Sequence, residues 1–410
     1  KVRKGRGYVL ALAWIMLTLT SGLAYHLGVD VNQRVWLFYN VSEYPVNELG
    51  NLREDIGYVI YTYILSHCFH GYVVMQLLTS AFITTAVMLF LKRYSRHFFT
   101  ALLIYYVFSY IHLNMEVVKT SMAISIFLFA WRFMEERKYL KYYILVVLAA
   151  SFHFSAIITW IIPLLILPGV RKWFLPGRRM LIMMVLSGLF GYSFKFLWTP
   201  LIQFLPRTQT ILKLYAGYTA VIESGCTLNF NGITGYILQY LLYPLAAVLL
   251  SLKMRNESFH GHGSRAYDSK EGDRLADVRI MSVLGIYIGI LGLFVPSFVR
   301  FIDYCVIFTI AILGSVSLSN LPERFGGSFF RHRRLQNLIV SAFLILPFFG
   351  LRVRTYLQPS GPEHDIPFYR LYYPYQSYLN PKDDADRTTL QVYFMPTNVP
   401  LTEIEDKTEK

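Results

Sequence analysis

The stretch KYYILVVLAASFHFSAIITWIIPLLIL, residues 141–167, decides how this chain is organised. It is 27 residues long and almost entirely apolar, with a single histidine, His153, near its middle. A helix needs about 20 apolar residues to cross the hydrocarbon of a bilayer. The stretch is therefore either one long span or two short segments that turn near His153. This choice sets the side of the membrane on which every later loop lies.

Basic residues distinguish the two structures, because Lys and Arg collect in the cytoplasmic loops of membrane proteins. The N-terminal arm is basic, and so are the turns at Lys92–Arg93 and Arg137–Lys138, which places all three inside. If residues 141–167 cross once, the basic loops at 171–179 and 253–279 lie outside, whereas a hairpin keeps them inside. The hairpin is therefore favoured, and short half-helices are tolerated at membrane depth where they line a cavity. This arrangement predicts about 11 transmembrane segments, with the N-terminus in and the C-terminus out.

The composition of the whole chain agrees with a membrane protein. Of the 410 residues, 55% are hydrophobic and 16% are charged, whereas a soluble domain carries roughly a quarter charged residues. The net charge of +14 does not indicate a nucleic-acid partner, because Lys and Arg lie in short loops between apolar runs. We therefore expect an all-α polytopic membrane protein. Besides the hairpin, spans are expected at Tyr8–Leu27, Tyr72–Leu91, Phe98–Leu113, Thr120–Met134, Met180–Trp198, Gly235–Leu252, Ile280–Val295, Phe301–Ser319 and Asn337–Leu351.

These spans form a single transmembrane domain over residues 1–352, with outer loops at 28–71 and 199–234 and an outer tail at 353–410. The first outer loop contains an expected short helix, Asp55–Phe69, which is too short to span.

The tail is rich in Tyr and Pro, and its acidic end, from Asp383 onward, is expected to be disordered. Cys68 and Cys226 both fall in outer loops, so a disulfide between them is an open possibility.

Ionisable residues at the outer rim are the candidates for chemistry, because charges near the hydrocarbon are costly. Glu116 and Lys119 are three residues apart, on one face of a helical turn. They form either an external ion pair, or Lys119 is a cation at the rim of an outward-facing cavity, where it would bind an anionic head group. His153, at the hairpin apex, is either a hydrogen-bonded structural residue or a donor to a phosphate or sugar oxygen.

Two further places on the outer side carry candidate residues. Arg300 suits a diphosphate because its planar fork bonds two oxygens, although a turn-stapling pair with Asp303 is the alternative. Glu54 and Asp55 open the short helix of the first outer loop, which gives a carboxylate a fixed position for general-base work. The alternative for each carboxylate is a solvated loop charge.

Several signatures are absent from the sequence. It has no Walker motif, no dinucleotide fingerprint, no zinc-type Cys/His spacing and no Gly-x-Ser-x-Gly elbow. An activated substrate must therefore arrive in the lipid phase. We expect no cofactor or metal, and a role for a divalent metal stays open.

The central blocks resemble the EpsG branch of the Wzy-type polysaccharide polymerases. The resemblance is carried by KTSMAISIF (119–127), LAASFHFSAII (148–158), RFIDY (300–304) and YPYQS (373–377). One position departs from the family pattern, because the Arg that usually opens the first block is Lys119 here. Lysine keeps the charge and loses the bidentate geometry.

This resemblance implies a GT-C-like membrane glycosyltransferase in the bacterial inner membrane. It would join oligosaccharide repeat units carried on undecaprenyl diphosphate at the periplasmic side, as an O-antigen, capsule or exopolysaccharide polymerase. Donor and acceptor would both be lipid-linked, and a chain-length regulator is a further partner that the resemblance allows.

The implied reaction is an inverting displacement. Glu54, Asp55 or His153 would take the acceptor proton, while Arg300 and Lys119 stabilise the leaving diphosphate. The diphosphate site would also include the residues Asp303, Tyr304 and Glu116.

Other functions stay open at this point. A lipid-linked glycan ligase uses the same donor and similar cations, so the sequence does not separate it from a polymerase. A flippase or transporter predicts internal repeats and charges deep in several spans, which are not found. A membrane O-acyltransferase also uses a histidine in the membrane, but its flanking pattern is not found.

Overall fold

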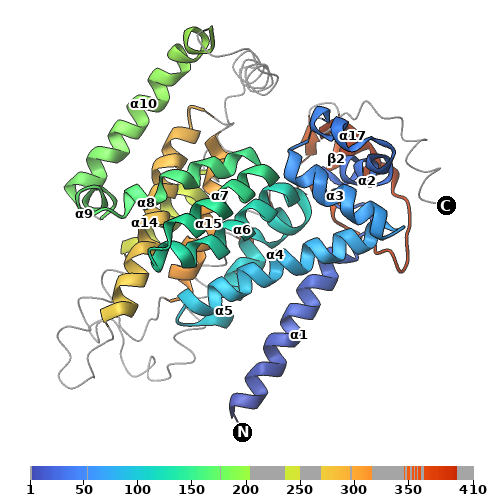
Figure 1. The fold of residues 1–410 in the computed structure, drawn as a ribbon, viewed down its shortest axis with the longest axis horizontal. Helices are drawn as coiled ribbons and strands as arrows, with labels where there is room; N and C mark the ends of the chain where they lie inside the picture. Colours follow the sequence, from blue (N-terminus) through green and yellow to red (C-terminus); the bar gives the residue numbers. More distant parts are fainter. Residues whose placement is uncertain are drawn as a thin grey trace. The chain divides into compact units, whose positions relative to one another are not determined.

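The computed structural model describes residues 2–52, 54–175, 177–203, 236–249, 269–295, 298–315, 346, 349–350, 353–354, 356–357, 359–361 and 364–394. These residues are mostly helical, as the sequence predicts (Figure 1). Contacts within the chain define two compact units. Unit 1 comprises Lys1–Phe90, Tyr105–Trp160 and Phe349–Lys410, and unit 2 comprises Leu91–Ile104 and Ile161–Phe348.

Unit 1 contains most of the N-terminal helices and the C-terminal segment. The helices that lie wholly or mostly in it are α1 (Val2–Gly22), α2 (Val31–Asn40), α3 (Ile56–Cys68), α4 (Tyr72–Tyr94), α6 (Val118–Glu135), α7 (Tyr139–Phe152) and α17 (Ala385–Phe394). Its 3-10 and π-helical turns are η1 (Val41–Glu43), η2 (Val46–Asn51), η3 (Tyr106–Tyr110), η4 (His112–Glu116), η5 (Phe154–Ile161) and η12 (Phe368–Leu371). Two short antiparallel strands, β1 (Pro359–Gly361) and β2 (His364–Pro367), precede η12.

Helices α1 and α4 pack against each other in antiparallel fashion. The hydroxyls of Ser21 and Ser80 lie 2.5 Å apart, and Trp14 Nε1 donates to Thr85 Oγ1 at 2.9 Å. These bonds join two otherwise apolar helices, and such side chains find partners across helices when little water is near.

Residues 28–71 fold around a small apolar core to which α4 and α6 also contribute. Phe38 from α2 and Tyr58 and Val59 from α3 are buried against Tyr72 and Met75 of α4. The short helix expected at Asp55–Phe69 is confirmed as α3, whereas α2 was not expected from the sequence. The core holds α2 and α3 in fixed positions. It thereby also positions the polar residues within α2 and just before α3.

The helix break and chain reversal expected near His153 are confirmed. α7 ends at Phe152, and His153 has an extended backbone. Tyr142 Oη then donates to the carbonyl of Thr159 at 2.5 Å, and the rings of Tyr143 and Trp160 lie 4.9 Å apart. Seventeen residues of straight helix would separate such positions by about 25 Å, so the chain must fold back.

The C-terminal segment is folded, in contrast to part of the expectation for it. Disorder was expected from Asp383 onward, but Ala385–Phe394 forms α17, in which Arg387, Leu390 and Gln391 are buried. Gln391 donates to the carbonyls of His26 and Gly28, so α17 is held against residues 26–28. Composition does not reveal buried polar pairs of this kind. The acidic composition of the segment therefore led to the wrong expectation of disorder for Ala385–Phe394.

Unit 2 contains the remaining helices. These are α5 (Phe98–Tyr105), α8 (Ile162–Leu165), α9 (Pro168–Arg171), α10 (Arg178–Gln203), α14 (Ser269–Gly292) and α15 (Val299–Leu313), with turns η6 (Lys172–Phe174) and η7 (Leu238–Leu242). α14 and α15 cross closely, because a Cβ on Gly285 would lie 2.9 Å from Cys305 Cβ. Ser282 and Thr309 share a hydrogen bond of 3.0 Å across the same pair.

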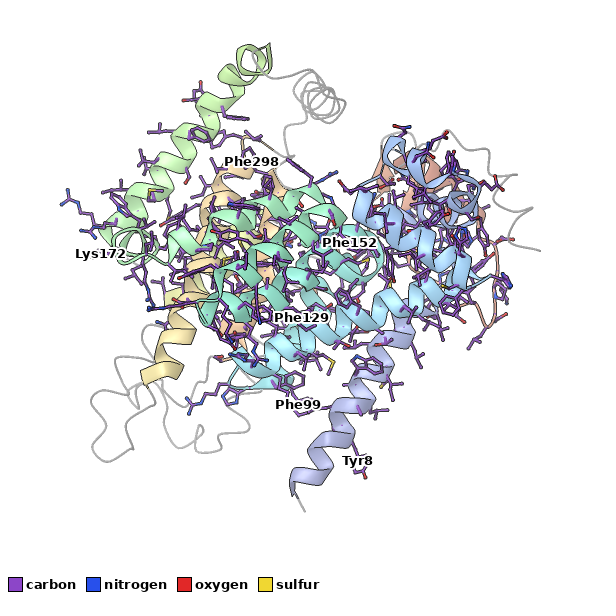
Figure 2. All side chains as sticks on the ribbon, in the orientation of Figure 1. Tyr8, Phe99, Phe129, Phe152, Lys172 and Phe298 are labelled. Atoms are coloured by element: carbon purple, nitrogen blue, oxygen red, sulfur yellow. The ribbon has the colours of Figure 1, made fainter. Side chains whose placement is uncertain are left out.

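The helices have the surface expected of a membrane protein. Among the described residues, α4 is the helix long and apolar enough to cross a membrane. Large apolar side chains are exposed along α1 and α10, including Leu12, Met16, Leu181 and Val185, and Figure 2 shows the exposed Tyr8 on α1. Exposed apolar surface of this extent suits contact with lipid. Shorter apolar helices are Gly7–Gly22, Phe98–Tyr110, Tyr139–Phe152, Phe154–Leu165 and Leu238–Leu249.

Some expectations fall outside the described residues. These are the outer loop 199–234 beyond residue 203, most of the span Asn337–Leu351, and Cys226. Cys68 is an exposed free thiol at the end of α3, so the structure does not show a disulfide at this residue.

Candidate functional site

An ion pair joins the start of α3 to the start of α6. Lys119 Nζ donates to Glu54 Oε2, and Gln33 Nε2 from α2 donates to Glu54 Oε1. The Glu54 side chain is 10% exposed and that of Lys119 is 21% exposed. Both carboxylate oxygens therefore already accept a hydrogen bond, while the ammonium group has two further N–H donors.

The residue that follows Gln33 in α2 is a buried arginine, Arg34. Arg34 donates through Nη2 to the carbonyl of Met115 at 3.0 Å and through Nε to the carbonyl of Asp30 at 3.3 Å. Its bond to Met115 ties α2 to η4, three residues before α6 begins at Val118. Arg34 therefore helps to hold the N-terminus of α6, and with it Lys119, in place.

The start of α3 packs against the end of α7. A Cβ added to Gly57 would lie 2.7 Å from the backbone carbon of Ser151, so only glycine fits this contact. The ring of Phe152, labelled in Figure 2, lies 6.0 Å from that of Tyr61 on α3, and the two ring planes are tilted by 58°. These contacts place the helix break at His153 close to the start of α3, which follows Glu54 and Asp55.

His153 has a local hydrogen-bonding role. Its Nδ1 accepts from the backbone N–H of Ser155 at 3.1 Å and lies 2.8 Å from Ser155 Oγ. An imidazole whose Nδ1 accepts carries its proton on Nε2 when neutral. His153 thus caps the start of η5 and presents Nε2–H as a donor.

Glu116 is held by two side chains from different parts of unit 1. His112 Nδ1 lies 2.6 Å from Glu116 Oε2, and Tyr372 Oη donates to Glu116 Oε1. Glu116 is followed by Val117, at which the helix is interrupted before α6 begins. Lys119 pairs with Glu54, so the Glu116–Lys119 ion pair considered from the sequence is not formed.

The structure brings five of the sequence-predicted residues together in unit 1. They are Glu54, Asp55, Glu116, Lys119 and His153, and Asp55 occupies the N-cap position of α3.

The other three sequence-predicted residues, Arg300, Asp303 and Tyr304, lie on α15 in unit 2. Arg300 is exposed, and among the described residues no ion pair between Arg300 and Asp303 is seen. Asp303 and Tyr304 are buried, 6% and 1% exposed respectively.

Sequence reasoning missed four residues of the site: Gln33, Arg34, His112 and Tyr372. Only His112 left a usable signal, because it precedes Glu116 by four residues on a helical segment. Tyr372 is 256 residues from Glu116, and no spacing rule connects them. Among the described residues, no group of three or more His, Cys, Asp or Glu side chains forms a metal-type cluster.

The exposed apolar helices and the ionic cluster at the helix ends define a helical membrane protein with a charged site. The profile of the EpsG family matches residues 7–377, and the chain therefore belongs to the EpsG family. It is a polysaccharide polymerase-like membrane protein, and the family is associated with glycosyltransferase-like polymerase activity. No curated protein and no solved structure matches the chain.

Proposed function

We propose that the protein is a membrane glycosyltransferase that polymerises oligosaccharide repeat units carried on undecaprenyl diphosphate. In this proposal it has about 11 transmembrane segments in a GT-C-like arrangement, lies in the bacterial inner membrane and acts at the periplasmic side. The N-terminus is inside and the C-terminus outside, so that the first outer loop and the C-terminal segment face the periplasm. Membership of the EpsG family supports the reaction class.

The Glu54–Lys119 ion pair is the observation that carries the proposal. Lys119 lies in the first turn of α6, where the helix dipole is already positive, and Glu54 balances part of this charge. An ammonium group at a helix N-terminus, with two donors remaining, suits the oxygens of a diphosphate. Lys119 therefore stabilises the leaving diphosphate in the proposed mechanism, and Glu54 aligns it.

Arg300 is proposed as a second cation for the diphosphate. Arg300 is exposed and forms no ion pair with another described residue, which leaves its guanidinium available to a ligand in this proposal. Asp303 and Tyr304 follow it on α15 and are proposed as further residues of the diphosphate site. Asp55 and His153 stay proposals for contacts to the acceptor sugar.

The test is a glycan profile of the host in which the gene is deleted and then replaced by variants. Deletion is expected to remove long polymer and to leave single repeat units on the lipid carrier. Lys119→Met is expected to lower polymerisation about 10²–10³-fold, the usual cost of losing one charge-stabilising donor. Lys119→Arg restores the family residue and is expected to stay active.

Lys138→Met is the matched control, because Lys138 is exposed and pairs with Glu136 just after the C-terminal end of α6, whereas Lys119 lies at its N-terminal end. Arg300→Ala with full polymer length would contradict the diphosphate role of Arg300. Full-length polymer that is left unattached would indicate a ligase. Repeat units retained on the cytoplasmic face would indicate a flippase.

A further inference from the structure

His112 and Glu116 form a carboxylate–imidazole pair within the π-helical turn η4. His112 Nδ1 lies 2.6 Å from Glu116 Oε2, and the two side chains are 29% and 20% exposed. A second π-helical turn, η3, precedes η4 directly. π-helical turns inside helices are rare and occur frequently at functional sites.

The pairing determines which nitrogen of His112 can accept a proton. An ionised carboxylate only accepts hydrogen bonds, so Nδ1 must carry the proton that it shares with Glu116. In the neutral ring the lone pair then lies on Nε2. A histidine oriented in this way by a carboxylate is the usual arrangement of a general base.

The C-terminal segment completes the arrangement. Tyr372 donates to Glu116 Oε1, so each oxygen of the carboxylate has a donor of its own and its orientation is fixed. Tyr372 is in turn positioned by its neighbours in the chain. The carbonyl of Leu371 accepts from the N–H of Gly28, and the N–H of Tyr378 donates to the carbonyl of Leu23.

The pair also lies next to the proposed diphosphate site. Met115, inside η4, accepts a hydrogen bond from Arg34, and Lys119 follows Glu116 by three residues. A base and a cation are therefore mounted on one short segment, residues 112–119.

We propose that His112 is the general base that activates the acceptor hydroxyl, with Glu116 and Tyr372 as positioning residues. This inference rests on the proposed glycosyltransferase function. It assigns the proton acceptor to a residue that had no role in the sequence analysis. It leaves Glu54, whose two oxygens are both engaged, as the partner that aligns Lys119.

The proposed step balances without a cofactor. The acceptor hydroxyl oxygen attacks the anomeric carbon of the donor sugar, and its proton passes to His112 Nε2. The new glycosidic C–O bond forms as the bond between the anomeric carbon and the diphosphate oxygen breaks. The electron pair of that bond leaves with the polyprenyl diphosphate, whose charge faces Lys119. Imidazolium then returns its proton to water.

The groups that face His112 set its behaviour. They include the Glu116 carboxylate on its own turn and, through Glu116, the Tyr372 hydroxyl of the C-terminal segment. An anionic carboxylate stabilises the imidazolium that forms during the step.

The experiment uses the full-length protein in lipid nanodiscs with a synthetic polyprenyl-diphosphate oligosaccharide as donor and acceptor. His112→Asn is the decisive variant, because the asparagine amide can still donate to Glu116 but offers no proton acceptor at the Nε2 position. Its kcat is expected to fall about 10²–10⁴-fold with little change in KM. His112→Ala is expected to be rescued in part by added imidazole.

His67→Asn is the matched control, because His67 is an exposed histidine of α3 whose Nδ1 bonds locally to the carbonyl of Tyr63. Glu116→Gln is expected to lower kcat without raising KM, as the loss of a positioning carboxylate should. If His112→Asn polymerises as fast as the wild type, His112 is not the base. If the wild type itself transfers no sugar, the proposed function fails first, and the two failures are therefore distinguishable.

Discussion

Gly57 on α3 packs against the backbone of Ser151 on α7, and a Cβ at position 57 would lie 2.7 Å from the carbonyl carbon and 2.8 Å from the carbonyl oxygen of Ser151. This contact joins two parts of the chain that are nearly one hundred residues apart. It holds the start of α3, which follows Glu54 and Asp55, against the end of α7, which precedes His153. The candidate site depends on it because these residues share no local segment.

Gly57→Ala is expected to destabilise the protein by about 1–3 kcal/mol, because the new Cβ would meet the backbone carbonyl of Ser151 as well as its hydroxyl, and the backbone cannot move aside cheaply. Without the clash, alanine would stabilise a helix by about 1 kcal/mol relative to glycine. The measurement is the thermal unfolding midpoint of the purified protein in detergent. Gly50→Ala is the control, because a Cβ at Gly50 meets nothing within 4 Å. A Gly57→Ala protein that unfolds at a higher temperature would contradict the packing.

The Glu54–Lys119 pair is expected to show energetic coupling in a double-mutant cycle. The free energies of unfolding of Glu54→Gln, Lys119→Met and the double variant should deviate from additivity by about 0.5–3 kcal/mol, because the two side chains touch and are mostly buried. Arg132 and Glu136 form a comparison pair, in which Arg132 is 63% exposed, and its coupling should be weaker. Additive effects at Glu54 and Lys119 would mean that the pair is not formed in the membrane.

Tyr142→Phe tests the chain reversal at His153. The substitution removes the hydroxyl that donates to the carbonyl of Thr159, a fully buried residue. The expected loss is about 1–3 kcal/mol in the free energy of unfolding. Tyr143→Phe is the matched control, because the contact of this residue is its ring against Trp160. Equal effects of the two substitutions would argue against the bond to Thr159.

Gln391→Ala is expected to release the C-terminal segment. Gln391 is 3% exposed, donates to the carbonyls of His26 and Gly28, and accepts from Asn32 Nδ2 at 3.1 Å. Removing the amide leaves three buried polar groups without this partner, so proteolysis between η12 and α17 should become faster. Thr389→Ala, on the exposed face of the same helix, should leave the cleavage rate unchanged. Resistance of Gln391→Ala to protease would show that other contacts suffice.

His153 can be separated into its capping role and its proposed role towards substrate. His153→Ala removes the acceptor for the N–H of Ser155 and should cost about 1 kcal/mol, as the loss of a cap does. His153→Asn places a carbonyl oxygen near the same N–H and should keep most of this stability. The measurements are unfolding and polymer length. An Asn variant that is stable but makes no polymer would support a contact of Nε2 with the sugar, and full activity would leave His153 with its cap alone.

The class of the protein could be predicted from the sequence because it depends on composition and on runs of apolar residues. The same holds for α3 and for the helix break at His153, which follow from the spacing of apolar residues and from the distribution of charge on either side of residues 141–167. The motifs at 119–127 and 148–158 also sufficed for the EpsG family, which the family profile confirms. Each of these inferences uses information within a few tens of residues.

The partners of the charged residues were decided only by the tertiary structure. Lys119 has Glu116 as its neighbour in sequence, yet it pairs with Glu54, which is 65 residues away, and Glu116 is taken by His112 and Tyr372. The acidic end of the chain was expected to be disordered, yet its described part forms α17 over Ala385–Phe394, because Arg387 and Gln391 find buried partners. A local pattern shows that a helix buries one face. It does not show which distant group will satisfy a charge once water is excluded, because that depends on the packing of Gly57 on Ser151 and of the C-terminal segment on residues 23–28.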